Sequence, residues 1–315
     1  MDVAIDAMKE AFAALSSGDA DVPDRTHMDV KPYEGVTLVM PAFVHDRQGS
    51  SMAVKVVSLF DRNTSHGLPR IQAAVLALEA ETGRPVAIAE GGALTAIRTG
   101  AASGAATDLL ARTDSRVCAI LGAGVQARTQ LEGVCTVRSI ETVWLYDPLP
   151  AAVEAMIEEM AGVGPIPDDI RSAGSPAEAL SQADVVCAAT VANTPAFDDG
   201  DLKPGAHINA IGSYQPEVRE LPAETVVRSL LVVDSREAVL AETGDLIQPI
   251  RDGLIGPEHI HAELGELVLG RKTCRDNAQQ ITLFKSVGIA VQDAVAVRTT
   301  LERAKRLGLG QRVPW

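Results

Sequence analysis

The feature that most constrains the fold is the stretch ILGAGVQA, Ile120 to Ala127. It continues an apolar run typical of a buried strand, and it carries Gly122, Gly124 and Ala127 with G-x-G-x-x-A spacing. In a dinucleotide-binding turn the first glycine permits a tight bend and the second lets the backbone approach a pyrophosphate. The third position is small so that the helix packs closely, and the helix N-terminus offers N–H groups to the anion. The motif predicts a dinucleotide site; a turn whose glycines serve packing alone is the alternative.

An acidic residue in the expected place supports the first interpretation. Asp147 ends the next apolar run, TVWLYD, 20 residues after Ala127. A dinucleotide domain places there the carboxylate that binds the adenosine ribose hydroxyls. Because this carboxylate would repel a 2′-phosphate, the sequence favours NADH over NADPH.

Two styles of sequence follow one another along the chain. Between about Gly35 and Glu90 apolar runs are separated by turn signals, and ETGR at 81–84 fits a hairpin, so an antiparallel sheet is expected. From about Arg116 onward strand-like runs alternate with helical ones, which predicts a doubly wound parallel sheet. The strands expected there are RVCAILGAG (116–124), TVWLYD (142–147), ADVVCAAT (183–190), AHINAIG (206–212) and SLLVVDS (229–235).

The C-terminal segment suggests how the two parts are connected. Residues 277–308 form a long helical pattern, longer than closing the parallel sheet needs, so this segment is expected to return to the first part. The fold class is therefore α/β, a Rossmann-type dinucleotide-binding domain inserted into a second, α+β domain. The expected bounds are 111–289 for the NAD(P)-binding domain and 1–110 with 290–315 for the substrate-binding and dimerisation domain.

Composition excludes several classes of function. A formal charge of −14 over 315 residues disfavours binding to nucleic acid or to anionic lipid surfaces. No apolar run approaches the length of a membrane span, and the chain starts with an amphipathic helical pattern instead of a secretory signal, so a cytoplasmic location is expected. The four cysteines lack C-x-x-C spacing and are expected to be buried thiols. His259 and His261 lie close together without a third ligand pattern, so no metal site is predicted.

Four basic residues are considered for the substrate site. Lys55 lies between valines in an apolar run, and taken alone it is best read as a solvated lysine on an edge strand. Arg25 follows a proline turn, and a surface position suits it. Arg70 also follows a proline, and both a surface position and a place beside the cofactor or substrate are open to it. Arg98 is different because a run of very small residues follows it, which leaves room for an anionic group to approach.

The order of motifs resembles the ornithine cyclodeaminase and mu-crystallin family over nearly the whole chain. The matching stretches are VPDRT (22–26), MPAF (40–43), VKVVS (54–58), GLPRIQAAVLALEAETGRPVAI (67–88), LTAIRTGAASGAA (94–106), LGAGVQA (121–127), GSYQPEVREL (212–221) and FKSVGIAVQD (284–293). That family includes cyclodeaminases, an archaeal type of alanine dehydrogenase, and reductases of cyclic ketimines. The resemblance implies a nicotinamide cofactor, NADH or NADPH, an imino or amino acid substrate and a homodimer.

The resemblance also implies roles for particular residues. It makes Arg25, Lys55 and Arg98 the groups that bind the substrate carboxylate, with Lys55 and Arg98 in the catalytic set and Lys55 as a candidate acid. The residues that it places at the cofactor are Thr99, Gly122, Gly124, Val125, Gln126, Ala127, Asp147, Thr190 and Ser286. Thr99 and Gly100 are expected at the N-terminus of a helix close to the cofactor phosphates. The group that stabilises the iminium is not assigned, although Tyr214, Glu217 and Glu220 are near enough in sequence to consider.

Two departures from the cyclodeaminases refine the expected activity. Tyr214 stands where those enzymes carry an aspartate that handles the amino group, and a tyrosine hydroxyl is a poor base at neutral pH. The loop is closer to the GS-x-x-P-x-x-RE version of ketimine reductases. A strand that usually precedes the first helix is also missing, which bears on the dimer contacts. The expected activity is therefore reduction of a cyclic or linear α-imino acid; ornithine cyclodeaminase, alanine dehydrogenase and a non-catalytic binding protein like mu-crystallin are the alternatives.

Overall fold

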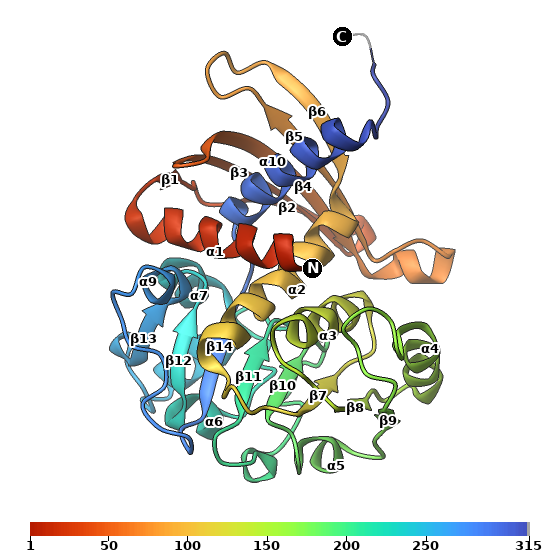
Figure 1. The fold of residues 1–315 in the computed structure, drawn as a ribbon, viewed down its shortest axis with the longest axis vertical. Helices are drawn as coiled ribbons and strands as arrows, with labels where there is room; N and C mark the ends of the chain where they lie inside the picture. The colour runs from red at the N-terminus through yellow and green to blue at the C-terminus, as the bar shows by residue number, and fades with distance from the viewer. Residues whose placement is uncertain (314–315) are drawn as a thin grey trace. The chain divides into compact units, whose positions relative to one another are not determined.

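The computed structural model describes residues 1–313, which form two compact units, each built around one β-sheet (Figure 1). The parallel-sheet unit contains residues 1–13 and 99–288, and the antiparallel-sheet unit contains residues 14–98 and the chain from Ile289 onward. Helices α1 (Asp2–Ser17) and α2 (Gly91–Leu110) run from one unit into the other. The expected bounds, 1–110 with 290–315 and 111–289, differ from this division, which passes through both helices. The roles expected of the two domains stay predictions.

The parallel-sheet unit contains an eight-stranded sheet, and every neighbouring pair in it is parallel. Its order is β13-β12-β14-β11-β10-β7-β8-β9. The strands are β7 (Val117–Leu121), β8 (Thr142–Tyr146), β9 (Ile170–Ser172), β10 (Val185–Ala188), β11 (His207–Ala210), β12 (Leu230–Val233), β13 (Ile260–Glu263) and β14 (Thr282–Lys285). Between them lie the helices α3 (Val125–Val137), α4 (Pro150–Met160), α5 (Pro176–Leu180), α6 (Ala223–Arg228), α7 (Arg236–Glu242), α8 (Gly244–Arg251) and α9 (Leu264–Val268), with short 3-10 helices at Asp199–Asp201 and Pro257–His259.

Both faces of this sheet are buried, as in a doubly wound fold. Successive residues of a strand point to opposite faces, so Ile120 packs in one core with α3 and α4 while its neighbour Leu121 packs in another with α5 to α8. Strands buried on both faces are almost continuously apolar, which explains why these runs were recognisable in the sequence. The predicted α/β fold class is confirmed. Along the chain, the segment that forms the parallel sheet lies between two segments of the other unit.

Small residues let α2 and α3 pack with their backbones in close approach. A Cβ atom added at Gly100 would lie 2.2 Å from the carbonyl oxygen of Thr129, and one at Gly133 would lie 2.3 Å from that of Gly100. Neither neighbour is a flexible side-chain end, so a larger residue would force the helices apart. The run of small residues after Arg98 therefore serves helix packing.

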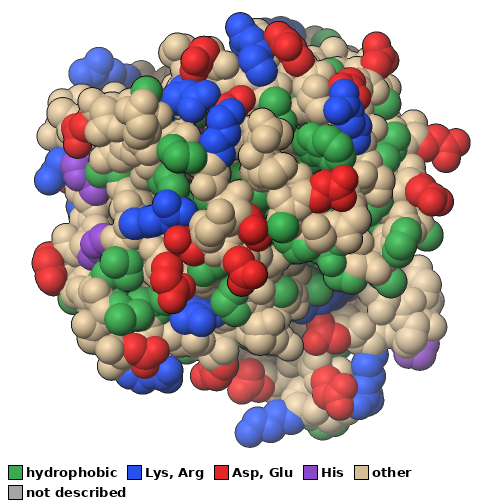
Figure 2. Space-filling view, turned by 90° about the horizontal axis from the view of Figure 1, so that it is seen from below, with side chains coloured by type: hydrophobic (Ala, Val, Ile, Leu, Met, Phe, Trp, Pro, Cys, Tyr) green, Lys and Arg blue, Asp and Glu red, His purple; other side chains and the backbone are tan. Residues whose placement is uncertain are grey.

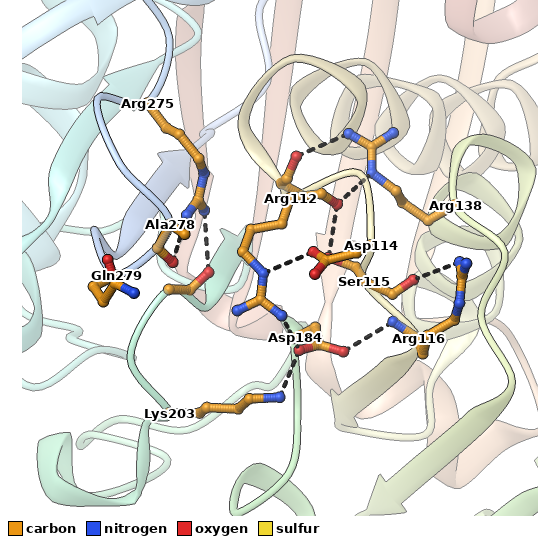
Figure 3. A network of polar contacts seen from close by, with 12 residues as sticks. Arg112, Asp114, Ser115, Arg116, Arg138, Asp184, Lys203, Arg275, Ala278 and Gln279 are labelled. Atoms are coloured by element: carbon orange, nitrogen blue, oxygen red, sulfur yellow. Dashed lines mark hydrogen bonds and ion pairs between the residues drawn. The ribbon is translucent and has the colours of Figure 1, made fainter.

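A polar network follows the C-terminal end of α2, where Arg112 pairs with Asp184 and Arg138 donates to the carbonyl oxygen of Arg112 (Figure 3). Arg138 donates hydrogen bonds to the carbonyl oxygens of Thr107, Asp108 and Ala111, and Arg275 donates to that of Leu110. The last turn of a helix leaves its carbonyl groups unpaired, and cations satisfy both these acceptors and the negative end of the helix dipole.

The antiparallel-sheet unit has the strand order β1-β3-β4-β5-β6, and β2 pairs with β3 beside this path. The strands are β1 (Ala20–Asp21), β2 (Thr26–Val30), β3 (Gly35–Asp46), β4 (Gly49–Phe60), β5 (Ile71–Leu78) and β6 (Pro85–Glu90), with 3-10 helices at Lys31–Tyr33 and Asp61–His66. Helix α10 (Ala290–Leu307) packs against β3, β4 and β5. The predicted antiparallel sheet and the hairpin at 81–84 are both present.

One expectation about the C-terminal segment is wrong. The helical pattern assigned to residues 277–308 contains β14, which lies inside the parallel sheet between β12 and β11, and the helix begins only at Ala290. A four-residue strand is too short to show a period of its own. The helical pattern of its flanks extends across the strand, so the sequence alone predicts a helix there.

On the face drawn in Figure 2, acidic side chains are interspersed with basic ones and no broad patch of a single sign covers it. Over residues 1–313, the helices are all too short or too polar to cross a bilayer.

Candidate active site

The glycine-rich turn has the backbone that its motif predicts. Gly122 follows β7 with φ of +98°, and a Cβ atom there would lie 2.6 Å from the carbonyl oxygen of Ala189. Its backbone N–H donates to the carbonyl oxygen of Tyr146 at 2.8 Å. A side chain at this position would be strained in both backbone and packing, so only glycine suits the bend.

Gly124 differs from Gly122 because it leaves space open. It is the N-cap residue of α3, no side chain caps that helix, and a Cβ atom at Gly124 would have nothing within 4 Å. The next residue, Val125, is 69% exposed. Uncapped N–H groups beside a position without a side chain form an anion-binding arrangement. The residues present therefore fit the pyrophosphate of a dinucleotide.

The other residues predicted around this turn lie at the same edge of the sheet. Ala127 is fully buried, as close packing of α3 requires. Gln126 is partly buried, and its Oε1 accepts no hydrogen bond from residues 1–313. Asp147 directly follows β8 and accepts hydrogen bonds from the N–H groups of Ala123 and Leu149, both at 2.9 Å. Its carboxylate thus ties the end of β8 to the glycine turn.

Thr190 and Ser286 lie beyond the carboxyl ends of β10 and β14, where ligands bind in open α/β sheets. The N–H and hydroxyl groups of Thr190 both donate to Glu220 at 2.7 Å, and the Ser286 hydroxyl donates to Asp234 at 2.7 Å. Two loops at this edge are therefore held in place by buried carboxylates.

A buried charged cluster at this edge was not foreseen from the sequence. Glu220 is fully buried, and it also accepts from the N–H of Gly212, so it links the loops after β10 and β11. Asp245 accepts from the N–H of Glu220 and lies 2.8 Å from Nζ of Lys285, which is fully buried as well. Burial raises the pKa of Glu220. The sequence offered no local signal, because Lys285 lay in a segment read as helix.

The expected position of Thr99 is wrong. Thr99 and Gly100 lie in the middle of α2, which begins at Gly91. The N-terminus of α2 is capped by Glu90, whose carboxylate accepts from the N–H groups of Gly92 and Ala93. The backbone N–H groups of residues inside a helix are used within it, so Thr99 and Gly100 present no helix N-terminus to a phosphate.

The antiparallel-sheet unit brings Lys55 and Arg98 together around one carboxylate. Lys55 lies on the buried face of the central strand β4, between Met40 of β3 and Val75 of β5, and not on a solvated edge. Its Nζ atom is 2.7 Å from Oδ2 of Asp293, and Nε of Arg98 is 3.2 Å from Oδ1 of the same carboxylate. Lys55 and Asp293 are each 1% exposed and Arg98 is 5% exposed.

These charges change the proton affinity of Lys55. Burial, followed by the charge of Arg98, lowers the pKa of Lys55 to about 8, while Asp293 opposes the shift. The third predicted cation, Arg25, is partly exposed in the segment between β1 and β2, and its charge adds to the lowering. A lysine with such a pKa exchanges protons close to neutral pH.

Other candidates from the sequence have ordinary surroundings. Arg70 forms an ion pair with Asp61, and His259 and His261 each contact a backbone carbonyl oxygen, of Val226 and Thr273. Within residues 1–313 no grouping of three or more His, Cys, Asp or Glu side chains could hold a metal ion. Three cysteines are buried free thiols, as expected, whereas Cys274 is only partly buried.

The chain is similar to known proteins over nearly its whole length. The model of the ornithine cyclodeaminase/mu-crystallin family matches residues 1–307. The chain is 37% identical over 309 residues to a Δ1-pyrroline-2-carboxylate reductase of Bacillus cereus, covering 96% of this chain and 94% of the relative. It superposes on the Thermococcus litoralis Δ1-pyrroline-2-carboxylate reductase in complex with NADH and L-proline with a TM-score of 0.94 and 45% identity, covering 98% and 95% of the two chains. An archaeal alanine dehydrogenase dimer with bound NAD gives a TM-score of 0.92 at 31% identity, covering 100% and 95%. The chain therefore belongs to the ornithine cyclodeaminase/mu-crystallin family.

Proposed function

We propose that this protein is an NADH-dependent reductase of cyclic α-imino acids such as Δ1-pyrroline-2-carboxylate. The observation that carries the proposal is the buried pair of cations, Lys55 and Arg98, in a chain that also has a dinucleotide-binding turn. The relatives named as pyrroline-2-carboxylate reductases, one of them bound to NADH and L-proline, support this substrate class.

The cofactor would be held at the glycine turn. The open position at Gly124 and the first N–H groups of α3 would receive the pyrophosphate. Asp147 would bind the adenosine ribose, and its negative charge disfavours the 2′-phosphate of NADPH. Thr190 and Ser286 lie at the carboxyl edge where the remaining part of the cofactor would extend. When bound, the nicotinamide supplies the hydride that the imine carbon accepts.

The substrate carboxylate would be held by the cations of the antiparallel-sheet unit. A guanidinium grips a carboxylate through parallel hydrogen bonds, and an ammonium adds a point charge. Arg98, Lys55 and Arg25 would thus bind and orient the imino acid for hydride transfer, and such positioning lowers the barrier by several kcal/mol. The imine nitrogen must gain a proton as its carbon gains the hydride. Lys55, with its pKa of about 8, is the proposed donor.

The similarity to an alanine dehydrogenase supports a second candidate, in which the substrate is the linear imine formed from pyruvate and ammonia. Cyclodeamination is disfavoured because Tyr214 stands where cyclodeaminases have an aspartate. A mu-crystallin-like binding protein would have no need of a buried lysine with a lowered pKa.

We also propose that the protein acts as a homodimer in the cytoplasm. The face of the antiparallel sheet opposite α10 is apolar and uncovered by residues 1–313, with Phe43 37%, Val56 42% and Ile88 68% exposed. An apolar sheet face of this kind marks a protein interface, and one related structure is described as a dimer. The free thiols agree with a reducing compartment.

The decisive experiment measures NADH and NADPH oxidation with Δ1-pyrroline-2-carboxylate and Δ1-piperideine-2-carboxylate, beside pyruvate with ammonia and beside L-ornithine with NAD+. Rapid turnover of a cyclic imine with NADH is the expected result. Turnover confined to pyruvate with ammonia would instead establish the second candidate. Tight NADH binding without turnover of any of these compounds would place the protein in the binding class.

A further inference from the structure

The carboxylate-binding site contains an acidic residue that the substrate chemistry does not call for. Asp293 lies in the first turn of α10, 238 positions after Lys55 in the chain, and it is buried between the two cations. The negative charge of Asp293 would repel a substrate carboxylate. Its presence in this site therefore needs another explanation. Its contacts point to what that is.

The two oxygens of Asp293 are divided between the two cations. Oδ2 lies 2.7 Å from the Lys55 ammonium and Oδ1 lies 3.2 Å from Nε of Arg98. The neighbouring residue Gln292 accepts a hydrogen bond from Nη1 of Arg98 at 2.7 Å, and it also accepts one from the N–H of Ile289. One guanidinium nitrogen thus donates a hydrogen bond to the start of α10, and a second lies at ion-pair distance from it.

The trio of Lys55, Arg98 and Asp293 has unbalanced charge and unsatisfied hydrogen-bonding groups. Lys55 and Arg98 carry two positive charges against one negative charge on Asp293, which leaves an excess that matches one carboxylate. Although their distances are those of ion pairs, neither Asp293 oxygen accepts a hydrogen bond of good geometry from residues 1–313, and Nε2 of Gln292 is buried without an acceptor there. Buried donors without acceptors are costly, and a ligand with carboxylate oxygens would relieve that cost.

A second ion pair on α10 shows what a purely structural contact looks like. Arg298 donates to both carboxylate oxygens of Asp46, at 3.0 and 2.8 Å, and the two charges cancel. This pair ties α10 to β3 as Asp293 ties it to β4. It differs from the Asp293 trio in being balanced and fully hydrogen-bonded through a bidentate contact.

We propose that Asp293 is a positioning residue of the substrate site, holding Lys55 and Arg98 at the spacing of a carboxylate's two oxygens and keeping Lys55 protonated for the reaction. The Asp293 carboxylate bridges Lys55 and Arg98 and so fixes the distance between the two cations. The carboxylate of the substrate has the same size and can bridge them in the same way. The inference rests on the proposed function and deepens it by assigning what places its two central cations.

The charge balance around Lys55 predicts how the pH profile responds. The charged groups that face Lys55 are Arg98 from α2, Asp293 from α10 and Arg25 from the segment between β1 and β2. The Lys55 ammonium is the active form, so kcat/KM falls as pH rises through the pKa of about 8. Without the negative charge of Asp293 the ammonium is less stable, so the fall begins at lower pH.

The test compares Asp293→Asn with Asp46→Asn, which removes the balanced pair on the same helix. With NADH saturating, D293N is expected to raise KM for the cyclic imine at least about tenfold. In the pH profile of kcat/KM, the decline at high pH (the falling limb) is expected to shift to lower pH by about one unit, which is a tenfold change in the protonation equilibrium. D46N is expected to lower the melting temperature and to leave both the limb and KM in place. An unmoved limb with unchanged KM in folded D293N would overturn the inference.

A second variant covers the case in which D293N does not fold. Asp293→Glu keeps the charge but displaces both cations, so it should leave the limb near pH 8 and still raise KM about tenfold, the cost of one misplaced charge contact of about 1.4 kcal/mol. A normal KM in D293E refutes the positioning role.

A binding measurement separates this inference from the proposed reaction. Pyrrole-2-carboxylate is a planar carboxylate that offers no imine for reduction, and its affinity can be followed by calorimetry across pH in the wild type and in D293N. If no imine is turned over by the wild type but this ligand binds with the same pH shift, the proposed function fails and the role of Asp293 stands. If imines are turned over and D293N binds the ligand as the wild type does at every pH, only the positioning inference fails.

Discussion

Replacing either glycine of the turn by alanine is expected to have a different effect. The substitution at Gly122 should lower the stability of the protein, and the one at Gly124 should leave its stability nearly unchanged. In Gly122→Ala, the new Cβ atom meets the carbonyl oxygen of Ala189 at 2.6 Å, on a backbone with φ of +98°. The left-handed backbone costs roughly 1–2 kcal/mol and the overpacking a further ~1–3 kcal/mol. In Gly124→Ala the Cβ atom meets nothing within 4 Å, and φ of −83° is open to any residue. The loss of an N-cap glycine and the stiffer unfolded chain then nearly cancel, within about 0.5 kcal/mol.

The substitution at Gly124 should instead impair cofactor binding. The methyl group would occupy the space through which the backbone meets the pyrophosphate, so we expect G124A to weaken NADH binding by about 10- to 100-fold, as one or two displaced charge-assisted hydrogen bonds imply. Urea denaturation of the apoprotein reports the stability of both variants, and fluorescence titration with NADH reports affinity. A wild-type NADH affinity in G124A, or a loss of several kcal/mol from its unfolding free energy, would refute the assignment of this turn.

Three further outcomes can be checked in the same assays. Gly100→Ala should destabilise the protein by about 2 kcal/mol, because a Cβ atom 2.2 Å from the Thr129 carbonyl oxygen outweighs the ~1 kcal/mol that alanine gains in a helix; a stabilised variant would contradict the close packing of α2 and α3. Arg138→Met should lose about 3 kcal/mol of unfolding free energy as three carbonyl groups at the end of α2 lose their donor, whereas the same change at the half-exposed Arg116 should lose under about 0.5 kcal/mol. Asp147→Asn should lower the preference for NADH over NADPH about tenfold, by removing one charge repulsion; steady-state KM values for both coenzymes decide this, and an unchanged ratio counts against the ribose role.

The glycine turn of the candidate cofactor site was predictable because its information is local. The turn at Gly122 and Gly124 lies within a few residues of the strand and helix that it joins, and a backbone that only glycine adopts leaves a mark in the sequence. The strands on either side are buried on both faces, so their apolar runs were visible as well. Thr99 was misplaced because small residues serve both anion sites and helix packing, and only the contact with Thr129 distinguishes the two uses.

What the sequence by itself determined is therefore the α/β class, the glycine turn and the identity of the basic residues. The tertiary structure alone decided where Lys55 lies, since its burial depends on a counter-ion, Asp293, that the chain supplies 238 positions later. It also decided that β14 enters the parallel sheet, because four residues carry too little pattern to outweigh the helical signals around them. Buried charge is stable only with its partner in place, and partners distant in the chain meet only when the fold is complete.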